Sequence, residues 1–135
     1  MDLVCNSCMG EQKKYQMTVS AQSQFLDDQS DVDKQRFVFA YTIRIENTGS
    51  VTAQLVSRHW IITDAEGVVQ EVRGLGVVGN QPMIKPGEHF EYTSGSSIAT
   101  AVGTMRGTYQ MVAEDGTHFD ATIPDFTLSM PRVLH

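Results

Sequence analysis

The chain has 135 residues, and 10 Lys and Arg residues against 16 Asp and Glu residues give it a formal net charge of −6. A protein of this charge repels polyanions as a whole, so we expect no nucleic-acid partner. A hydrophobic fraction of 41% with 19% charged residues is typical of globular proteins and excludes an intrinsically disordered chain and a membrane protein. The length corresponds to a single domain.

The start of the chain carries no recognisable targeting segment. Residues 1–8 lack the basic and apolar regions of a secretory signal. The longest unbroken apolar run, residues 37–41, is far shorter than the roughly 18 residues that suggest a membrane span. We therefore expect a cytoplasmic protein without membrane contact. Residues 1–14 show no hydrophobic periodicity, so we expect a flexible N-terminal tail there and one domain over residues 15–135.

Alternating apolar residues predict several β-strands in chain order. The clearest case is the series Phe37, Phe39, Tyr41, Ile43 and Ile45, which a strand collects on one face and a helix would scatter. Further strands, separated by Gly-, Asn- and Asp-containing turns, are expected over residues 15–22, 51–63, 68–73, 89–93, 107–113 and 117–123, with 126–128 as a closing edge strand.

Little helix is expected, because Gly or Pro interrupts every longer window of helical periodicity and leaves at most one turn over residues 98–101. Seven to eight short strands without helical crossovers predict an all-β protein. The favoured architecture is an immunoglobulin-like (fibronectin type III-like) antiparallel β-sandwich. In that fold Trp60 is a candidate core tryptophan and Tyr109 a candidate tyrosine corner.

Gly74, Gly76 and Gly79 form a G-x-G-x-x-G pattern. In dinucleotide-binding domains this pattern lies between a strand and a helix whose N-terminus holds the pyrophosphate. Pro82 and Pro86 follow too closely for that helix, so the sequence excludes a Rossmann unit.

Three interpretations of this glycine-rich loop stay open. It is a structural loop with Val77 and Val78 against the edge of the core, an anion site, or a protein-contact loop. In the anion site, backbone N–H groups of the loop and the side chain of Arg73 would hold a phosphate.

Arg58, His59 and Trp60 place a cation and an imidazole on opposite faces of a strand, beside an aromatic ring. One interpretation is an anion or partner contact near the glycine-rich loop. The other is an interior tryptophan flanked by exposed polar groups.

Candidate metal ligands lack the spacing that a metal site requires. Cys5 and Cys8 form a C-x-x-C without a second ligand pair, so we interpret them as incidental thiols. Four carboxylates within residues 27–33 lack the glycine and the distal glutamate of a calcium loop and predict a solvated acidic loop. No metal site and no cofactor are expected, since ligand spacing is also missing among His59, His89, His118 and His135.

Signatures of catalysis are not found in the sequence. It has no G-x-S-x-G nucleophile elbow, no phosphate-loop lysine motif and no H-E-x-x-H. We therefore expect no catalytic residues and a protein that is not an enzyme.

Long parts of the chain resemble the bacterial ApaG family. The resemblance is strongest over residues 58–64 and 71–82, which read RHWIITD and EVRGLGVVGNQP, and it continues through residues 103–111 and 123–126. It covers nearly everything from Tyr15 to the C-terminus. It implies a fibronectin type III-like sandwich in a small cytoplasmic protein.

The resemblance also implies a genetic link to cobalt resistance and magnesium efflux. Because no segment of the chain spans a bilayer, such an effect on efflux would be indirect. Related domains occur in F-box proteins and in a polymerase delta-interacting protein, where they look like adaptors. The family's glycine motif, considered as a pyrophosphate-binding element, maps onto Gly74, Gly76 and Gly79.

The sequence thus predicts a noncatalytic interaction or adaptor module that presents residues 58–60 and 74–82 to a protein partner. The alternative is a binder of nucleotide or pyrophosphate, with or without a divalent cation. The partner's identity and the formation of a homodimer stay open. Candidate binding residues are Arg58, His59, Arg73, Gly74, Gly76 and Gly79.

Overall fold

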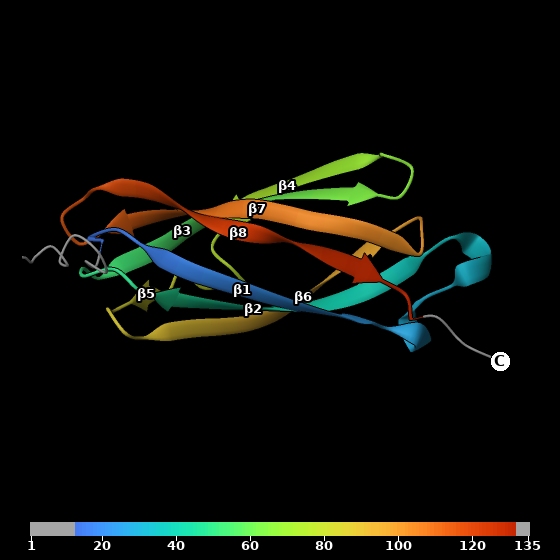
Figure 1. Ribbon diagram of the computed structural model, residues 1–135, viewed down its shortest axis with the longest axis horizontal. Coiled ribbons are helices and arrows are strands. Elements are labelled where there is room, and N and C mark those ends of the chain that lie inside the picture. Colours follow the sequence, from blue (N-terminus) through green and yellow to red (C-terminus); the bar gives the residue numbers. More distant parts are fainter. Residues whose placement is uncertain (1–12, 132–135) are drawn as a thin grey trace, which may run out of the picture.

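Two antiparallel sheets make up the fold, and the computed structural model describes residues 13–131. One sheet has the order β1-β2-β6 and the other the order β4-β3-β7-β8, with β5 paired to β3 (Figure 1). The predicted all-β, immunoglobulin-like sandwich is confirmed. In these residues the strands are β1 (Met17–Phe25), β2 (Phe37–Asn47), β3 (Ala53–Asp64), β4 (Val69–Leu75), β5 (Met83–Ile84), β6 (His89–Ile98), β7 (Val102–Ala113) and β8 (His118–Ser129).

The core lies between the inner faces of the two sheets. Every second residue of β2 from Phe37 to Ile45 is buried, as the alternation predicts. Trp60 in β3 is only 2% exposed, and its ring centroid lies 5.3 Å from that of Tyr41 and 6.3 Å from that of Tyr109. The prediction of Trp60 as a core tryptophan is confirmed.

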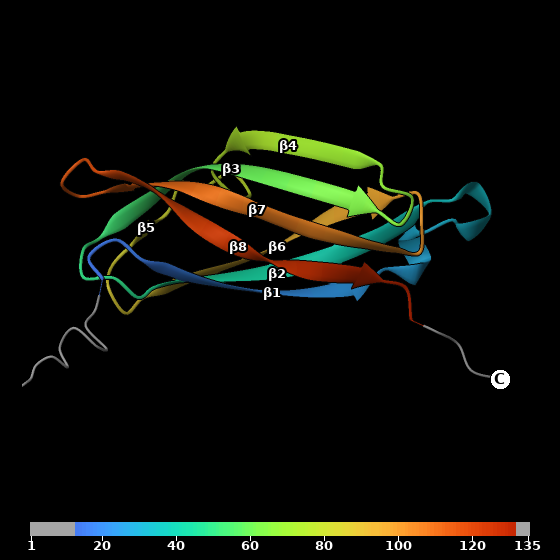
Figure 2. The ribbon, with the colours of Figure 1, turned by 45° about the horizontal axis from the view of Figure 1, so that its top comes forward.

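The two long sides of the sandwich differ. On one side β1 lies against β8, and the Ser23 hydroxyl donates a hydrogen bond to the Thr127 carbonyl (2.8 Å) across the junction (Figure 2). On the other side the edge strands are β6 and β4, and β4 stands out from the body of the sandwich (Figure 2). The side closed by β1 and β8 is therefore packed, whereas the side of β4 and β6 is where a site can open.

The expected break between a strand over residues 117–123 and an edge strand over residues 126–128 is wrong. β8 runs through both because Pro124 lies in an irregularity of the β7–β8 ladder, where Met105 pairs with Phe126 but Gly107 with Ile123. Proline is tolerated at such a bulge and on an edge strand, since its missing N–H removes no ladder bond there.

The expected helical turn over residues 98–101 is also wrong. Ile98 ends β6, and residues 99–101 bend directly into β7. The short helices lie instead in the acidic loop, as 3-10 turns at Asp27–Gln29 and Val32–Lys34. Within residues 13–131, no helix is long and apolar enough to cross a membrane.

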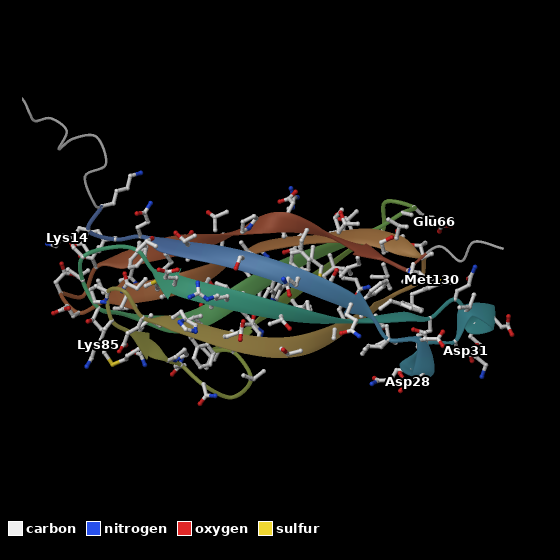
Figure 3. All side chains as sticks on the ribbon, turned by 60° about the horizontal axis from the view of Figure 1, so that its bottom comes forward. Lys14, Asp28, Asp31, Glu66, Lys85 and Met130 are labelled. Atoms are coloured by element: carbon white, nitrogen blue, oxygen red, sulfur yellow. The ribbon has the colours of Figure 1, made fainter. Side chains whose placement is uncertain are left out.

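The acidic loop lies far from the chain's described N-terminal end. Asp28 and Asp31 occupy one end of the sandwich, and Lys14 and Lys85 occupy the opposite end (Figure 3). Asp27, Asp28 and Asp33 are exposed, in agreement with a solvated loop. Asp31 accepts a hydrogen bond from the Lys34 amide (3.3 Å), so this carboxylate caps the second 3-10 turn.

Tyr109 is not a tyrosine corner. Such a residue donates its hydroxyl hydrogen bond to an upstream backbone carbonyl. The Tyr109 hydroxyl instead pairs with the Tyr92 hydroxyl of the facing sheet at 2.6 Å, in the buried interior. Tyr109 therefore joins the two sheets through side chains.

The predicted tail over residues 1–14 lies mostly outside the described residues and stays a prediction. At its C-terminal end, the Tyr15 hydroxyl donates a 2.5 Å hydrogen bond to the Asp115 carboxylate in the β7–β8 turn. This bond and the Thr117 amide lower the pKa of Asp115 to about 2.

We expect Asp115→Asn to make the stability of the protein less dependent on pH. Because the pKa of Asp115 is depressed in the folded state, its contribution is present above the usual pKa of 3.8 and is lost as the pH falls towards 2. Thermal melts of both proteins should therefore differ at pH 7 and converge near pH 2. A difference in melting temperature that stays constant over this pH range would contradict the coupling of stability to the ionisation of Asp115.

Candidate functional site

The candidate binding residues divide between two faces of the sheet that contains β4. Residues paired across an antiparallel ladder share a face. Arg58 pairs with Gly74 on the inner face, together with Trp60, and His59 pairs with Arg73 on the outer face. The structure therefore brings together only part of the predicted set.

On the inner face, Arg58 holds the end of β4 and the loop after it. Its Nη1 donates hydrogen bonds to the Leu75 carbonyl (3.0 Å) and the Gly76 carbonyl (2.8 Å). Gly74 lies directly under the guanidinium, since a Cβ there would come within 2.7 Å of Arg58 Nη2. Gly74 thus leaves room for the Arg58 guanidinium in its present position, an explanation that needs no ligand.

On the outer face, Glu71 contacts the side chains of both His59 and Arg73. His59 Nε2 lies 2.9 Å from Glu71 Oε1, and Arg73 Nη2 lies 3.5 Å from the same oxygen. The hydrogen bond with His59, and then the charges of His59 and Arg73, lower the pKa of Glu71. Sequence reasoning missed Glu71 because the register that sets it beside His59 is a property of the sheet.

The glycine-rich loop closes on itself as a tight hairpin. Val77 and Asn80 exchange both backbone hydrogen bonds at 2.8 Å, and the Gly76 amide donates to the Val56 carbonyl (2.8 Å). A Cβ on Gly76 would lie 2.2 Å from the Asn80 carbonyl oxygen. The hairpin therefore uses several of the N–H groups that a phosphate cradle would need, and nucleotide or pyrophosphate binding stays a prediction.

The tip of this hairpin is strained at Val78. Val78 and Gly79 have φ values of +41° and +82°, as the two central residues of a type I′ turn require. Glycine adopts this conformation freely, but a β-branched residue does so at a cost of about 1 to 3 kcal/mol. Val77 lies in the core as expected, whereas Val78 is 53% exposed, so the prediction that it packs against the core edge is wrong.

We expect Val78→Asn to stabilise the protein by about 1 kcal/mol, because Asn followed by Gly is the preferred pair of a type I′ turn. The midpoint of urea denaturation, measured at unchanged slope, is the test. Val102→Asn is the matched control, since this exposed valine lies in a strand. A lower midpoint for Val78→Asn would contradict the assignment of strain.

Between β4 and β6 the structure contains a cleft made of two adjoining cavities of about 270 and 260 Å³. Both are lined by Tyr41, Arg58, Trp60 and Ser94, so they lie side by side. We call it the intersheet cleft. The sequence did not predict that β6 contributes to the wall of this cleft, because Ser94 belongs to the facing sheet.

The Tyr92 phenol lines one of the two cavities, and its hydroxyl group is hydrogen-bonded to that of Tyr109. Burial raises the pKa of Tyr92 to about 12, although its hydrogen bond with Tyr109 and smaller contributions from Arg58 and the Trp60 N–H oppose the shift. Burial likewise raises the pKa of Tyr109. Both phenols are therefore neutral at physiological pH.

Apolar side chains gather on and around β4. Of eight large hydrophobic side chains exposed within residues 13–131, six lie between positions 68 and 83. Leu75 is the most exposed of them, at 75%. We call this set the β4 surface, and its members are Val68, Val69, Val72, Leu75, Val78 and Met83.

No group of three or more His, Cys, Asp or Glu side chains that could hold a metal ion occurs in the described part of the chain. Cys5, Cys8 and His135 lie outside it.

Comparison with known proteins identifies relatives that carry the same family name. A family model described as the ApaG domain matches residues 27–113. The chain is 66% identical to Protein ApaG of Thiobacillus denitrificans and 64% identical to Protein ApaG of Dechloromonas aromatica. Both alignments extend over 127 residues, which are 94% of this chain and 100% of each relative.

A solved structure supports the same relationship. The crystal structure of a Bordetella pertussis protein described as ApaA superimposes with a TM-score of 0.87 at 58% identity, and the match covers 90% of this chain and 99% of that one. The extent of these matches agrees with the resemblance carried by residues 58–64 and 71–82. The chain belongs to the ApaG family.

Proposed function

We propose that this ApaG protein is a noncatalytic interaction module, and that it binds an extended segment of a partner protein along β4. The observation that carries the proposal is the β4 surface, where six of the eight exposed large hydrophobic side chains of the described residues follow the edge formed by β4, β5 and the segments beside them. Exposed apolar groups concentrated in one place are characteristic of protein-binding sites. Any influence on cobalt or magnesium homeostasis would then act through the bound partner.

The free edge of β4 supplies a backbone for such binding. The Gly76 amide donates to Val56, and the Val68 carbonyl accepts from the Asp64 amide, so even-numbered residues of this segment point their backbone groups toward β3. Backbone groups alternate along a strand, so those of residues 69, 71, 73 and 75 point away from the sheet. A partner strand can pair with those of residues 69, 71 and 73 and with the Leu75 amide, as in other cases of strand addition, whereas the Leu75 carbonyl already accepts from Arg58.

The side chains suit the same mode of binding. Val69 and Leu75 lie on the outer face of β4 and Val72 on its inner face, so apolar groups flank the edge on both sides. A strand added at this edge would cover the apolar side chains of both faces at once. The strained Val78 adds an exposed apolar group at one end, and such strain is concentrated at functional sites in proteins.

Site-specific photocrosslinking in bacterial cells that express the full chain tests this proposal. With p-benzoylphenylalanine at position 75, we expect one covalent adduct of defined mass. The same residue at position 102, an exposed valine outside the β4 surface, serves as the matched control and should give none.

Arg73→Pro makes the test specific for strand addition. It removes an N–H that points away from β3 and leaves the β3–β4 ladder intact, so the adduct should disappear. Arg73→Ala removes the side chain but keeps the N–H, so the adduct should persist. Equal adducts from positions 75 and 102, or an adduct that survives Arg73→Pro, would contradict the proposal. An adduct between two copies would identify the partner as a second copy of the chain.

A further inference from the structure

The intersheet cleft contains polar groups that the fold itself does not satisfy. It lies between β4 and β6 and extends down to Trp60, because the β6 wall consists of the small residues Ser94, Gly95 and Ser96. Ser94 and Ser96 lie on the inward-facing side of β6, so their hydroxyl groups line the cleft. The cleft is therefore both open and lined by donors.

Arg58 places a positive charge in this cleft without a counter-ion. It is half-buried and lines both cavities, and no carboxylate of residues 13–131 lies within ion-pair distance of it. Within residues 13–131, the guanidinium donates hydrogen bonds through Nη1 alone, to the carbonyl oxygens of Leu75 and Gly76. Removing a cation from water is unfavourable unless an anion or enough acceptors compensate, so an anion entering the cleft would be attracted to Arg58.

Trp60 supplies a second donor at the same place. Its Nε1 is buried and has no hydrogen-bond acceptor among the described residues, which is rare for a buried indole N–H. The Trp60 ring lines both cavities, and its N–H lies near the Tyr92 hydroxyl, which lines the second cavity, without forming a hydrogen bond to it. A ligand oxygen that reaches this N–H from the cleft would therefore satisfy a donor that is otherwise unpaired.

The rest of the lining indicates what kind of anion fits. Tyr41, Ile62 and Val72 provide apolar contact area, and Arg58 is the only cation that lines the cavities. One guanidinium balances a single negative charge, whereas a phosphate or pyrophosphate carries more. The neighbouring phenols are neutral and add no positive charge.

We infer that the intersheet cleft binds a monoanionic carboxylate attached to an apolar or aromatic group. The carboxylate accepts hydrogen bonds from Arg58 and from Trp60 Nε1, and the apolar group lies against Tyr41, Ile62 and Val72. A free small acid and the C-terminal residue of a peptide share this chemistry. This inference concerns the inner side of β4 and does not depend on strand addition at its free edge.

The single tryptophan of the chain provides a direct readout. The full chain, labelled with nitrogen-15, is titrated with phenylacetate, and the Trp60 indole N–H resonance is followed by NMR. We expect a saturable downfield shift as this N–H gains an acceptor. Phenylacetamide, which has the same shape without the charge, should produce no saturable shift.

A further pair of probes distinguishes the two sources. A short peptide ending in Phe is compared with the same peptide carrying a C-terminal amide. Binding of the acid peptide alone would assign the site to peptide C-termini, whereas binding of phenylacetate alone would assign it to free acids. Either result supports the carboxylate site.

Variants test the assigned residues by calorimetry with phenylacetate. Arg58→Gln should weaken binding about tenfold or more, because a charge-assisted hydrogen bond is lost. Arg106→Gln, on the outer face, is the matched control and should bind like the native chain. Because Arg58 also holds the loop, Ser96→Leu is included as a variant that fills the cleft and leaves those hydrogen bonds in place.

Several results would overturn the inference. These are an unshifted Trp60 resonance at millimolar phenylacetate, equal shifts from the amide, or binding that survives both Arg58→Gln and Ser96→Leu. Tighter binding of inorganic phosphate or pyrophosphate than of carboxylates would also overturn it. A negative result here would leave the crosslink from position 75 unaffected, so the two proposals fail separately.

Discussion

Trp60→Ala should destabilise the protein by about 4 to 5 kcal/mol, at the upper end of the range for large-to-small changes in cores. The Trp60 side chain is 2% exposed and packs edge-on against Tyr41, Tyr109 and Phe126 from both sheets. Its removal leaves a cavity where the two sheets meet. Because whole domains are stable by only about 5 to 15 kcal/mol, we expect a large shift in the urea midpoint.

Two further variants show whether this loss comes from packing. Trp60→Phe keeps an aromatic ring and should cost about 2 kcal/mol. Val68→Ala, at an exposed position, should change the free energy of unfolding by less than about 0.5 kcal/mol. A loss for Trp60→Ala no larger than that of Val68→Ala would show that the core is not centred on Trp60.

Gly107→Ala should destabilise the protein by about 3 kcal/mol, although it adds only one methyl group. A Cβ at position 107 would lie 2.2 Å from the His59 carbonyl oxygen and 3.2 Å from Trp60 Cα. Both are backbone atoms of the neighbouring strand, so no side chain can move aside. Relief requires β3 and β7 to separate in the middle of their ladder.

Gly95→Ala provides the matched control for Gly107→Ala. At this position in β6 a Cβ would meet only the Phe39 carbonyl oxygen, at an ordinary contact distance of 3.5 Å. We expect a change in stability within about 0.5 kcal/mol. Chemical denaturation of the two variants, measured side by side, decides the matter, and equal effects would contradict the close approach at Gly107.

The strands of this fold could be predicted where one face is buried and the other is not. Phe37, Phe39 and Ile43 alternate with less buried residues because β2 lies under the other sheet on one side only. The end of β8 could not be predicted in the same way. Pro124 interrupts the local pattern, and its tolerance depends on an irregularity in pairing with β7, which is a property of two strands together.

The candidate site shows the same limit. Arg58 and Gly74 stand sixteen positions apart in the sequence and were both named as binding residues, but their direct contact follows from the β3–β4 register. Glu71 and Ser94 were missed. Glu71 contacts His59 diagonally across the β3–β4 ladder, and Ser94 lines the cleft from the facing sheet, so neither contact is visible in the sequence. Local patterns identify the strands, whereas the pairing of those strands creates the cleft.

The junction of β1 with β8 has a consequence for how the protein is made. These are the first and last strands of the described chain, and they close one side of the sandwich together. Roughly 80 residues separate the end of β2 from the end of β8, which corresponds to about 4 to 16 seconds of synthesis at ordinary ribosomal rates. During that interval the β1–β2 hairpin lacks its neighbour. Closure of the fold therefore waits for the ribosome to finish β8, and the nascent chain is the state in which β1 is most open to unwanted pairing.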